Sequence, residues 1–386
     1  MSVKGLDALH LDHRDVLVRV DYNVPFNDSG EISDDSRIRA SLPTIESLLK
    51  RGCRLTLMSH CGRPKGQPDP KFSLKPVANH LASLLDQKVP LIENLDTPVH
   101  LAQVQMLENL RFDPGETAND PVFAAKLAAF GDVYINDAFG TAHRAHASTH
   151  AVARHFEEKG AGLLMMRELH YLREALRKPE RPFLAILGGS KISDKLKIIK
   201  ALLAKVDQLI IGGGMSFTFL KAKGIDIGNS LLESDFLEEA AEIMATCKAR
   251  NIDLLLPLDH VTGESISEDT DPGITIDQSI EPGLMGLDIG PETIHLYTSA
   301  IQNAKTVVWN GPMGVFELQA FSTGTISIAE ALAENTGLTI TGGGDSVAAV
   351  NLADVADRIT HISTGGGASL ELLAGHELPG IAALES

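Results

Sequence analysis

The sequence feature that most constrains the fold is a recurring pair of segments. A short apolar, β-branched run ends at glycine or at a polar cluster, and a helical pattern follows it. Such near-continuous apolar strands are typical of a parallel sheet that helices cover on both faces. Ten runs are present, beginning at Asp15, Arg54, Val104, Val133, Phe183, Gln208, Asp253, Thr306, Leu338 and His361. Because ten strands exceed one compact sheet of ordinary size, we expect two doubly wound α/β domains.

Two of the intervening segments are informative as helices. In Asp194–Val206 the apolar residues recur at steps of three and four, and Ser193 or Asp194 is a candidate cap. Met165–Lys178 is a charged amphipathic segment that is followed by two prolines, which indicates a helix that ends there. We expect this second helix to join the two domains.

The domain boundaries follow from that linker helix. We place the first domain at residues 1–164, the linker helix and hinge at 165–182, and the second domain at 183–367. Residues 377–386 form a short apolar tail, and the pattern alone does not show where it packs.

Composition limits the function classes. The chain has 386 residues, with 34 Lys and Arg against 51 Asp and Glu and a formal net charge of −17, which argues against a nucleic-acid partner. There is no apolar signal segment at the start and no run of about 18 apolar residues, so we expect a cytoplasmic protein without a membrane partner. Cys53, Cys61 and Cys247 form no CxxC pair, which argues against disulfides and cysteine-bound zinc.

Charge and glycine are distributed unevenly along the chain. Eleven of the arginines and ten of the fourteen histidines precede Tyr171, whereas twenty-four of the 34 glycines follow it. If an anionic ligand binds, the first half offers cationic side chains and the second half offers backbone N–H groups.

Four glycine clusters follow predicted strands of the second half, at Gly188–Gly189, Gly212–Gly214, Gly342–Gly344 and Gly365–Gly367. Ligands of doubly wound sheets bind at that edge, where glycine lets the backbone approach a phosphate closely. One such cluster serves equally well as a turn or a helix cap, but four together favour a nucleotide site. Neither GxxxxGK[ST] nor GxGxxG is present, because Phe217 stands where the latter needs its third glycine.

Side chains near these glycines could complete the nucleotide site. Lys191 and Lys195 are four residues apart beside a predicted helix start, where they could reach phosphate oxygens or simply form a solvated face. Asp345 follows the third cluster, where a carboxylate suits either Mg²⁺ or a helix cap. Glu317 could accept hydrogen bonds from ribose hydroxyls, or it is an ordinary surface glutamate.

The first half carries a different set of side chains at strand ends. Any one of these arginines could be a salt-bridged surface residue, but several together indicate a small, multiply charged anion. His143 and His146 could be metal ligands, although the sequence offers no convincing third ligand. The candidate anion-binding residues are Asp21, Asn23, Arg37, His60, Arg63, Arg111 and Arg144.

The ordered set of motifs resembles the phosphoglycerate kinase family. The matching segments are VRVDYNVP, SHCGRP, LENLRF, NDAFGTAHRAH, ILGGSKISDK, GGGMSFTFLK, VVWNGPMGVFE, GGGDS and STGGGASLE, and they span nearly the whole chain. Cys61 stands where leucine is usual in the family, and Ser190 stands where alanine is usual. Both departures spare the charged positions.

The resemblance implies reversible transfer of the acyl phosphate of 1,3-bisphosphoglycerate to Mg-ADP, which gives 3-phosphoglycerate and Mg-ATP. It also implies a monomer with two Rossmann-like domains, with the tail at 368–386 returning to the first. Arg37 and Lys191 would be catalytic, Asp345 would bind the metal, and the seven residues of the first half would bind phosphoglycerate. The implied nucleotide-binding residues are Lys191, Lys195, Gly212, Gly213, Glu317, Gly343, Gly344, Asp345 and Ser346.

The implied chemistry needs no general base, because the acceptor oxygen belongs to a carboxylate without a proton to remove. It does need the two domains to close, so that water is excluded from the phosphates. Two alternatives remain at this point. An NAD-dependent oxidoreductase would require the missing GxGxxG fingerprint, and a non-catalytic nucleotide-binding protein would not require the arginines and histidines.

Overall fold

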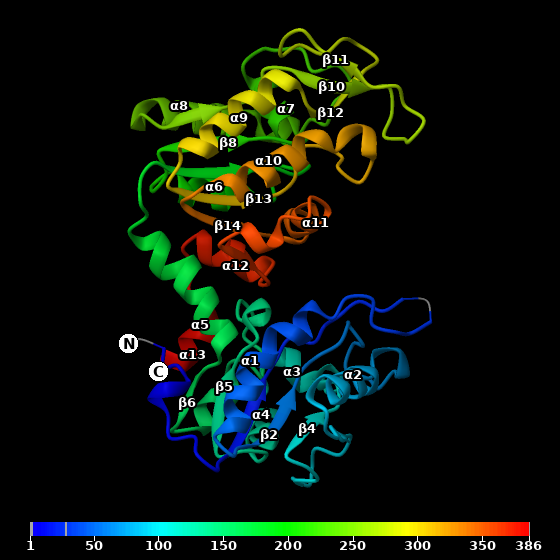
Figure 1. The fold of residues 1–386 in the computed structure, drawn as a ribbon, viewed down its shortest axis with the longest axis vertical. Coiled ribbons are helices and arrows are strands. Elements are labelled where there is room, and N and C mark those ends of the chain that lie inside the picture. The colour runs from blue at the N-terminus through cyan, green and yellow to red at the C-terminus, as the bar shows by residue number, and fades with distance from the viewer. Residues whose placement is uncertain (1–2, 28, 386) are drawn as a thin grey trace. The chain divides into compact units, whose positions relative to one another are not determined.

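The computed structural model describes residues 3–27 and 29–385, so Ser386, the end of the expected tail, lies outside the described residues. The chain divides into two compact units (Figure 1). The first contains the residues up to His170 together with those from Glu377 onward, and the second runs from Tyr171 to His376.

The first unit is built on a six-stranded parallel sheet whose strand order is β3-β4-β2-β1-β5-β6. Its inner strands consist of consecutive buried residues, as the apolar runs predict. The strands are β1 (Asp15–Arg19), β2 (Arg54–Met58), β3 (Leu91–Ile92), β4 (Val104–Leu107), β5 (Val133–Asn136) and β6 (Lys159–Ala161). The helices are α1 (Ser36–Lys50), α2 (Lys75–Leu85), α3 (Pro114–Ala118), α4 (Pro121–Ala128), α5 (Leu163–Leu169) and α13 (Pro379–Glu385).

The second unit contains a six-stranded parallel sheet, in the order β15-β14-β13-β7-β8-β9, and a small antiparallel sheet. The parallel strands are β7 (Phe183–Leu187), β8 (Gln208–Ile211), β9 (Asp253–Leu255), β13 (Thr306–Asn310), β14 (Leu338–Gly342) and β15 (His361–Ser363). The small sheet contains β10 (His260–Gly263), β11 (Gly273–Ile274) and β12 (Met285–Ile289). The helices are α6 (Leu196–Leu202), α7 (Ser216–Ala222), α8 (Leu237–Arg250), α9 (Pro291–Asn303), α10 (Thr323–Glu334), α11 (Gly344–Leu352) and α12 (Gly367–Leu373).

All ten apolar runs are strands of the two parallel sheets, and helices flank each sheet (Figure 1). The predicted fold class is therefore confirmed. The tail returns to the first unit as the family resemblance implies, but only from Glu377 onward, since residues 368–376 belong to the second unit. The amide of Gly380 in α13 donates to the carbonyl of Ala142 in the first unit at 2.8 Å. The antiparallel sheet was not predicted.

Two helix predictions differ from the structure. The expected helix Met165–Lys178 begins earlier and is α-helical only in α5; it continues as a π-helix over His170–Glu174 and a 3₁₀ turn over Ala175–Arg177. The wider π turn coincides with the division between the two units. α6 is shorter than Asp194–Val206, and its cap position is Lys195, which makes no side-chain capping bond.

Candidate functional site

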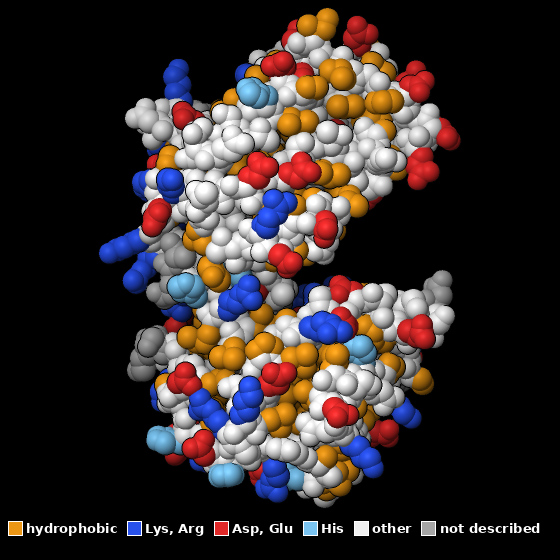
Figure 2. All heavy atoms as spheres, in the orientation of Figure 1, with side chains coloured by type: hydrophobic (Ala, Val, Ile, Leu, Met, Phe, Trp, Pro, Cys, Tyr) orange, Lys and Arg blue, Asp and Glu red, His pale blue; other side chains and the backbone are white. Residues whose placement is uncertain are grey.

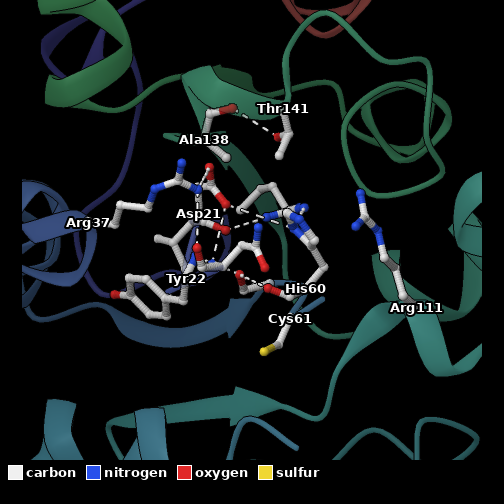
Figure 3. A network of polar contacts seen from close by, with 12 residues as sticks. Asp21, Tyr22, Arg37, His60, Cys61, Arg111, Ala138 and Thr141 are labelled. Atoms are coloured by element: carbon white, nitrogen blue, oxygen red, sulfur yellow. Dashed lines mark hydrogen bonds and ion pairs between the residues drawn. The ribbon is translucent and has the colours of Figure 1, made fainter. Parts of the chain in front are cut away.

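Polar side chains gather where β1 and β2 end in the first unit. Because the two strands are parallel neighbours, the segments that follow them lie at the same edge of the sheet. Asp21 receives a hydrogen bond from Nη1 of Arg37, on α1, at 3.0 Å, and the same nitrogen donates to the carbonyl of Asn23 at 3.3 Å (Figure 3). The Asn23 side chain accepts from the amide of Gly62, after β2, at 2.8 Å. These contacts hold Arg37 at the strand ends.

Arg111 approaches the same region from the turn after β4 (Figure 3). Its Nη1 donates to the carbonyl of Gly62 at 2.7 Å, and its buried Nε has no hydrogen-bond partner among the described residues. Burial, and then the positive charges of Arg19 and Arg144, lower the pKa of Arg111 to about 10. A buried guanidinium with an unused donor and cationic neighbours is a site that favours an anion.

Two histidines in this cluster are neutral. Burial, and then the charge of Arg19, hold the pKa of His60 well below its ordinary value. Burial, followed by the charges of Arg111 and Arg19, lowers the pKa of His146 to about 4. The cluster therefore combines cationic guanidinium groups with uncharged imidazoles that can still exchange hydrogen bonds.

The structure brings together most of the residues proposed for the anion site. Asp21, Asn23, Arg37, His60 and Arg111 are linked by the contacts above or by short electrostatic distances, such as 3.9 Å from Nδ1 of His60 to Oδ1 of Asp21. Arg144 donates to the ring of His143 at 3.0 Å, and its charge acts on Arg111. Arg63 lies exposed in the loop after β2 and takes no part in these contacts within the described part of the chain.

Sequence reasoning missed three buried members of the cluster. Arg19 is fully buried at the end of β1, and its Nε donates to Oγ of Ser148 at 2.8 Å. Ser148 Oγ in turn donates to Glu116 at 2.7 Å. Arg19 could have been found, because a charged residue inside the apolar run DVLVRVDY is unusual. Glu116 and Ser148 carry no such signal, because they lie in polar segments that only the fold brings to β1.

The glycine turns of the second unit interlock at the carboxyl edge of its parallel sheet. The amide of Gly189, after β7, donates to the carbonyl of Pro312, after β13, at 2.9 Å. Gly213, after β8, has a φ of +65°, and a β-carbon there would lie 2.8 Å from backbone atoms of Gly189 and Pro312. Glycine is required at Gly213 by both conformation and space, so these turns form a close-packed backbone surface.

The turn before α11 completes this edge. Gly343 has a φ of +98°, and a β-carbon there would lie 2.6 Å from the side-chain nitrogen of Asn310. Gly344 and Asp345 are exposed in the first turn of α11, and the buried Ser346 hydroxyl accepts from the amide of Gly311 at 2.6 Å. The N–H groups at the start of α11 therefore face outward with a favourable dipole for an anion.

The two lysines of the candidate nucleotide site differ in environment. The Lys195 ammonium is half-buried and donates to the side chain of Asn310 at the end of β13. Burial lowers the pKa of Lys195, and the charge of Asp345 opposes that shift. Lys191 is exposed. The capping role suggested for Ser193 or Asp194 is wrong, because the Ser193 hydroxyl and amide both donate to the carboxylate of Glu233.

A cavity of about 320 Å³ opens beside these turns. A β-carbon at Gly212 would lie 2.4 Å from Sδ of Met313, a residue that lines this cavity. The volume of the cavity is at the lower end of the range for small-molecule sites. Its lining combines apolar side chains, glycine backbone and carboxylates. Residues lining it include Gly189, Gly213, Phe217, Leu231, Met285, Pro312, Val315, Glu317 and Asp345. The exposed Glu317 and Asp345 are thus placed on one cavity with the glycine turns.

Metal and thiol chemistry are limited by what the residues offer. Among the described residues, no group of three or more His, Cys, Asp or Glu could hold a metal ion. His143 and His146 therefore have no third ligand of these types in that part of the chain. Asp345 offers one exposed carboxylate beside the glycine turns, which suits a Mg²⁺ ion whose other ligands are phosphate oxygens.

The Cys61 thiol lies in the first unit. Burial raises its pKa to about 11, so Cys61 is not a thiolate at neutral pH.

The charged side chains on the surface of the second unit are distributed differently from those in the two candidate sites. Figure 2 shows acidic side chains spread across the visible face of the second unit rather than gathered in one place. No helix of the described residues is long and apolar enough to span a membrane.

Comparisons with known proteins agree over the whole chain. A family model described as "Phosphoglycerate kinase" matches residues 6–376. A phosphoglycerate kinase of Clostridium botulinum (strain Hall) is 50% identical over 391 residues, covering 99% of this chain and 98% of the relative. One of Koribacter versatilis is 51% identical over 400 residues, covering 100% and 99%. The structure of phosphoglycerate kinase from Coxiella burnetii is similar with a TM-score of 0.93 and 40% identity, covering 99% of each chain.

Proposed function

This chain belongs to the phosphoglycerate kinase family, and from that premise we propose that it transfers the acyl phosphate of 1,3-bisphosphoglycerate reversibly to Mg-ADP, giving 3-phosphoglycerate and Mg-ATP. Family membership alone makes it a nucleotide-binding glycolytic kinase and removes the oxidoreductase alternative. The observation that carries the finer proposal is the cluster in which Arg19, Arg37 and Arg111 surround neutral His60 and His146. Such a cluster suits a ligand with several negative charges.

The proposed phosphoglycerate site lies at the carboxyl edge of the first sheet. Guanidinium groups would bind phosphate and carboxylate oxygens in pairs, and Asp21 and Asn23 would bind the hydroxyl. Arg37 is already oriented by Asp21, so little side-chain freedom is lost when the ligand arrives. The proposed ligand-binding residues are Asp21, Asn23, Arg37, His60, Arg63, Arg111 and Arg144.

The proposed nucleotide site lies at the glycine turns of the second unit. The nucleobase would occupy the 320 Å³ cavity, with Glu317 placed to accept from ribose hydroxyls. Backbone N–H groups of Gly343, Gly344 and Ser346 would face the phosphates, and Lys191 and Lys195 would bind phosphate oxygens. The N–H groups of Gly212 and Gly213 donate to the carbonyls of Leu187 and Met313, so these two glycines would contribute close backbone approach to the nucleotide and not hydrogen bonds. Asp345 would hold Mg²⁺, which neutralises phosphate charge when it is bound.

The protein's part in the chemistry is positioning and charge stabilisation rather than proton transfer. The acceptor oxygen is a carboxylate oxygen, so no general base is required. We assign Arg37 and Lys191 to the charge on the transferring group and Lys195 to the nucleotide phosphates. Lys195 fits this role because its ammonium already donates to Asn310 at the phosphate edge.

Substrate and nucleotide are assigned to different units, so the proposed reaction requires the units to close. Closure would exclude water and complete the charge around the phosphates. We propose hinges within 165–182 and near Ser363–Gly367. Small-angle scattering should show a smaller radius of gyration with both ligands than with either alone, and an unchanged radius would count against closure.

A coupled assay tests the activity itself. Mg²⁺-dependent formation of ATP from 1,3-bisphosphoglycerate and ADP is the expected result, and no turnover under these conditions would leave only a nucleotide-binding role. The proposed enzyme works as a cytoplasmic monomer, and light scattering after size-exclusion chromatography checks its mass against one chain of 41.3 kDa.

A further inference from the structure

Arg19 belongs to the cationic cluster but is not among the residues proposed to bind the ligand. It is the last residue of β1, it is fully buried, and it does not reach the surface of the ligand site. Its Nε donates to Oγ of Ser148 at 2.8 Å, and Nη1 donates to the carbonyl of Val20. The remaining Nη2 lies 3.1 Å from Nδ1 of His60. All three nitrogens of the guanidinium are therefore engaged, one of them with a proposed ligand-binding residue.

The contact between Arg19 and His60 has only one possible direction. A guanidinium has five N–H donors and no acceptor, so Nη2 donates and Nδ1 must accept. A neutral imidazole carries one proton on its two nitrogens. Since burial and the surrounding charges hold the pKa of His60 well below its ordinary value, the ring is neutral near pH 7. Its single proton is consequently on Nε2.

Nε2 is also the nitrogen that remains available. Nδ1 is 3.9 Å from Oδ1 of Asp21, which is too long for a hydrogen bond. Within the described part of the chain no hydrogen bond uses Nε2, and Figure 3 shows the His60 ring among Asp21, Arg37 and Arg111. A donor directed into a cluster of cationic groups is suited to an anionic oxygen.

We propose that Arg19 is a positioning residue that fixes His60 in the Nε2–H tautomer, so that His60 serves the anionic substrate as a neutral hydrogen-bond donor and not as a cation. The identity of that substrate rests on the proposed function, whereas the tautomer is a property of the free protein. The charge near His60 comes from the guanidinium groups of Arg19, Arg111 and Arg37 and from the carboxylate of Asp21. His146 also faces it and is neutral.

The orientation of Arg19 has its own support. Ser148 accepts from Arg19 through its hydroxyl oxygen and donates its proton to Oε1 of Glu116 at 2.7 Å, while its amide donates to Oε2 at 3.0 Å. Glu116 is fully buried on α3. The hydroxyl of Ser148 therefore connects the buried guanidinium of Arg19 to the buried carboxylate of Glu116. These contacts fix the orientation of the guanidinium.

The direct test is ¹⁵N NMR of the histidine side chains in the full chain without substrate. His60→Gln identifies the His60 signals by their loss. Between pH 6 and 8 we expect Nε2 to carry the proton and Nδ1 to show the shift of an unprotonated nitrogen. A proton on Nδ1, or on both nitrogens at pH 7, would overturn the proposal, and this result requires no variant at Arg19.

Two variants test whether Arg19 is the cause. Arg19→Met should give His60 a detectable Nδ1–H population and should weaken 3-phosphoglycerate binding roughly tenfold or more, as expected when a hydrogen bond to a charged ligand is misdirected. Arg39→Met is the matched control, because Arg39 is exposed on the same domain and, among the residues that the structure describes, pairs with Asp35 alone. A folded Arg19→Met protein with the parent tautomer would refute the positioning role.

Two further measurements keep the test decisive. If Arg19→Met does not fold, Ser148→Ala keeps the charge of Arg19 but removes the hydroxyl that accepts from its Nε. This variant should also show an Nδ1–H population of His60. An unchanged tautomer in Ser148→Ala would refute the positioning role of Arg19. Addition of 3-phosphoglycerate should shift the Nε2–H signal of the parent. No shift despite measured binding would contradict the donor role, whereas absence of both binding and ATP formation would contradict the proposed function and leave the tautomer standing.

Discussion

The neutral state of His146 makes the stability of the first unit depend on pH. Burial, and then the charges of Arg111 and Arg19, lower the pKa of His146 from 6.5 to about 4. In the unfolded chain the ring returns to its ordinary pKa near 6.5. Between these two values the unfolded state binds a proton at His146 that the folded state does not, so the contribution of this ring to the free energy of unfolding falls as the pH falls through this window.

The size of the effect follows from the two pKa values. One pKa unit corresponds to about 1.4 kcal/mol, so the shift from 6.5 to about 4 corresponds to about 3 kcal/mol once the pH is below both values. About 2 kcal/mol of this is lost between pH 7 and pH 5, because the ring becomes protonated in the unfolded chain over that interval while it stays neutral in the fold. His146→Gln removes the titrating group and should remove about 2 kcal/mol of this dependence.

The assay must report on the first unit. Hydrogen exchange of amides in β1 and β5, measured at several urea concentrations at pH 7 and pH 5, gives the local free energy of opening. The single tryptophan, Trp309, lies in the second unit, so its fluorescence reports that unit separately. His295→Gln is the matched control, because His295 is exposed on α9 of the second unit; it should keep the parent's profile.

Two results would refute this reasoning. If His146→Gln loses as much stability between pH 7 and pH 5 as the parent does, His146 is not the titrating group. If NMR titration of the parent gives His146 a pKa near 6.5, its burial among guanidinium groups does not disfavour the charged ring. The second result holds even where the variant folds poorly.

Three further predictions address the catalytic and nucleotide sites. Arg37→Ala should lower kcat roughly 100- to 1000-fold and leave ADP affinity within about twofold, because the charge of Arg37 is needed chiefly in the transition state. Steady-state kinetics measure kcat and calorimetry measures ADP affinity, and Arg39→Ala, at an exposed arginine, is the control. Gly343→Ala should cost about 1–3 kcal/mol of stability, since φ is +98°, whereas Gly344→Ala, with nothing within 4 Å of its β-carbon, should keep its thermal midpoint within about a degree. Asp345→Asn should raise the Mg²⁺ concentration for half-maximal rate roughly tenfold and leave 3-phosphoglycerate affinity unchanged.

The sequence predicts the parallel sheets well, because their strands are buried on both faces and are therefore continuously apolar. It does not predict the antiparallel sheet. β11 is two exposed residues, Gly273–Ile274, and β10 begins at His260 and ends at glycine, so neither shows an apolar run or an alternating pattern. β6, with the sequence KGA, likewise is a strand only because β5 lies beside it. Short strands of this kind are specified by their neighbours and not by their own residues.

The residues of the candidate sites also differ in how far the sequence alone can identify them. Sequence position identifies Arg37, His60 and Arg111, because each follows or faces the end of a recognisable apolar strand. It cannot separate Arg63, which is exposed, from Arg111, which is buried with an unpartnered Nε, since both are arginines in loops after strands. Burial and partners decide that difference, and both depend on long-range packing.

The acidic composition and the basic site act over different distances. The net charge of −17 repels an anionic substrate through solvent, but at physiological ionic strength that field is screened within about 8 Å. Arg37 and Arg111 act at contact distance in a partly buried site, with the buried Arg19 behind them, and screening there is weak so that each charge counts for more. Surface charge therefore governs solubility and long-range encounter, while a few buried guanidinium groups can govern affinity. The pKa of Arg111 is lowered first by burial and then by the charges of Arg19 and Arg144, and a bound anion would offset both effects.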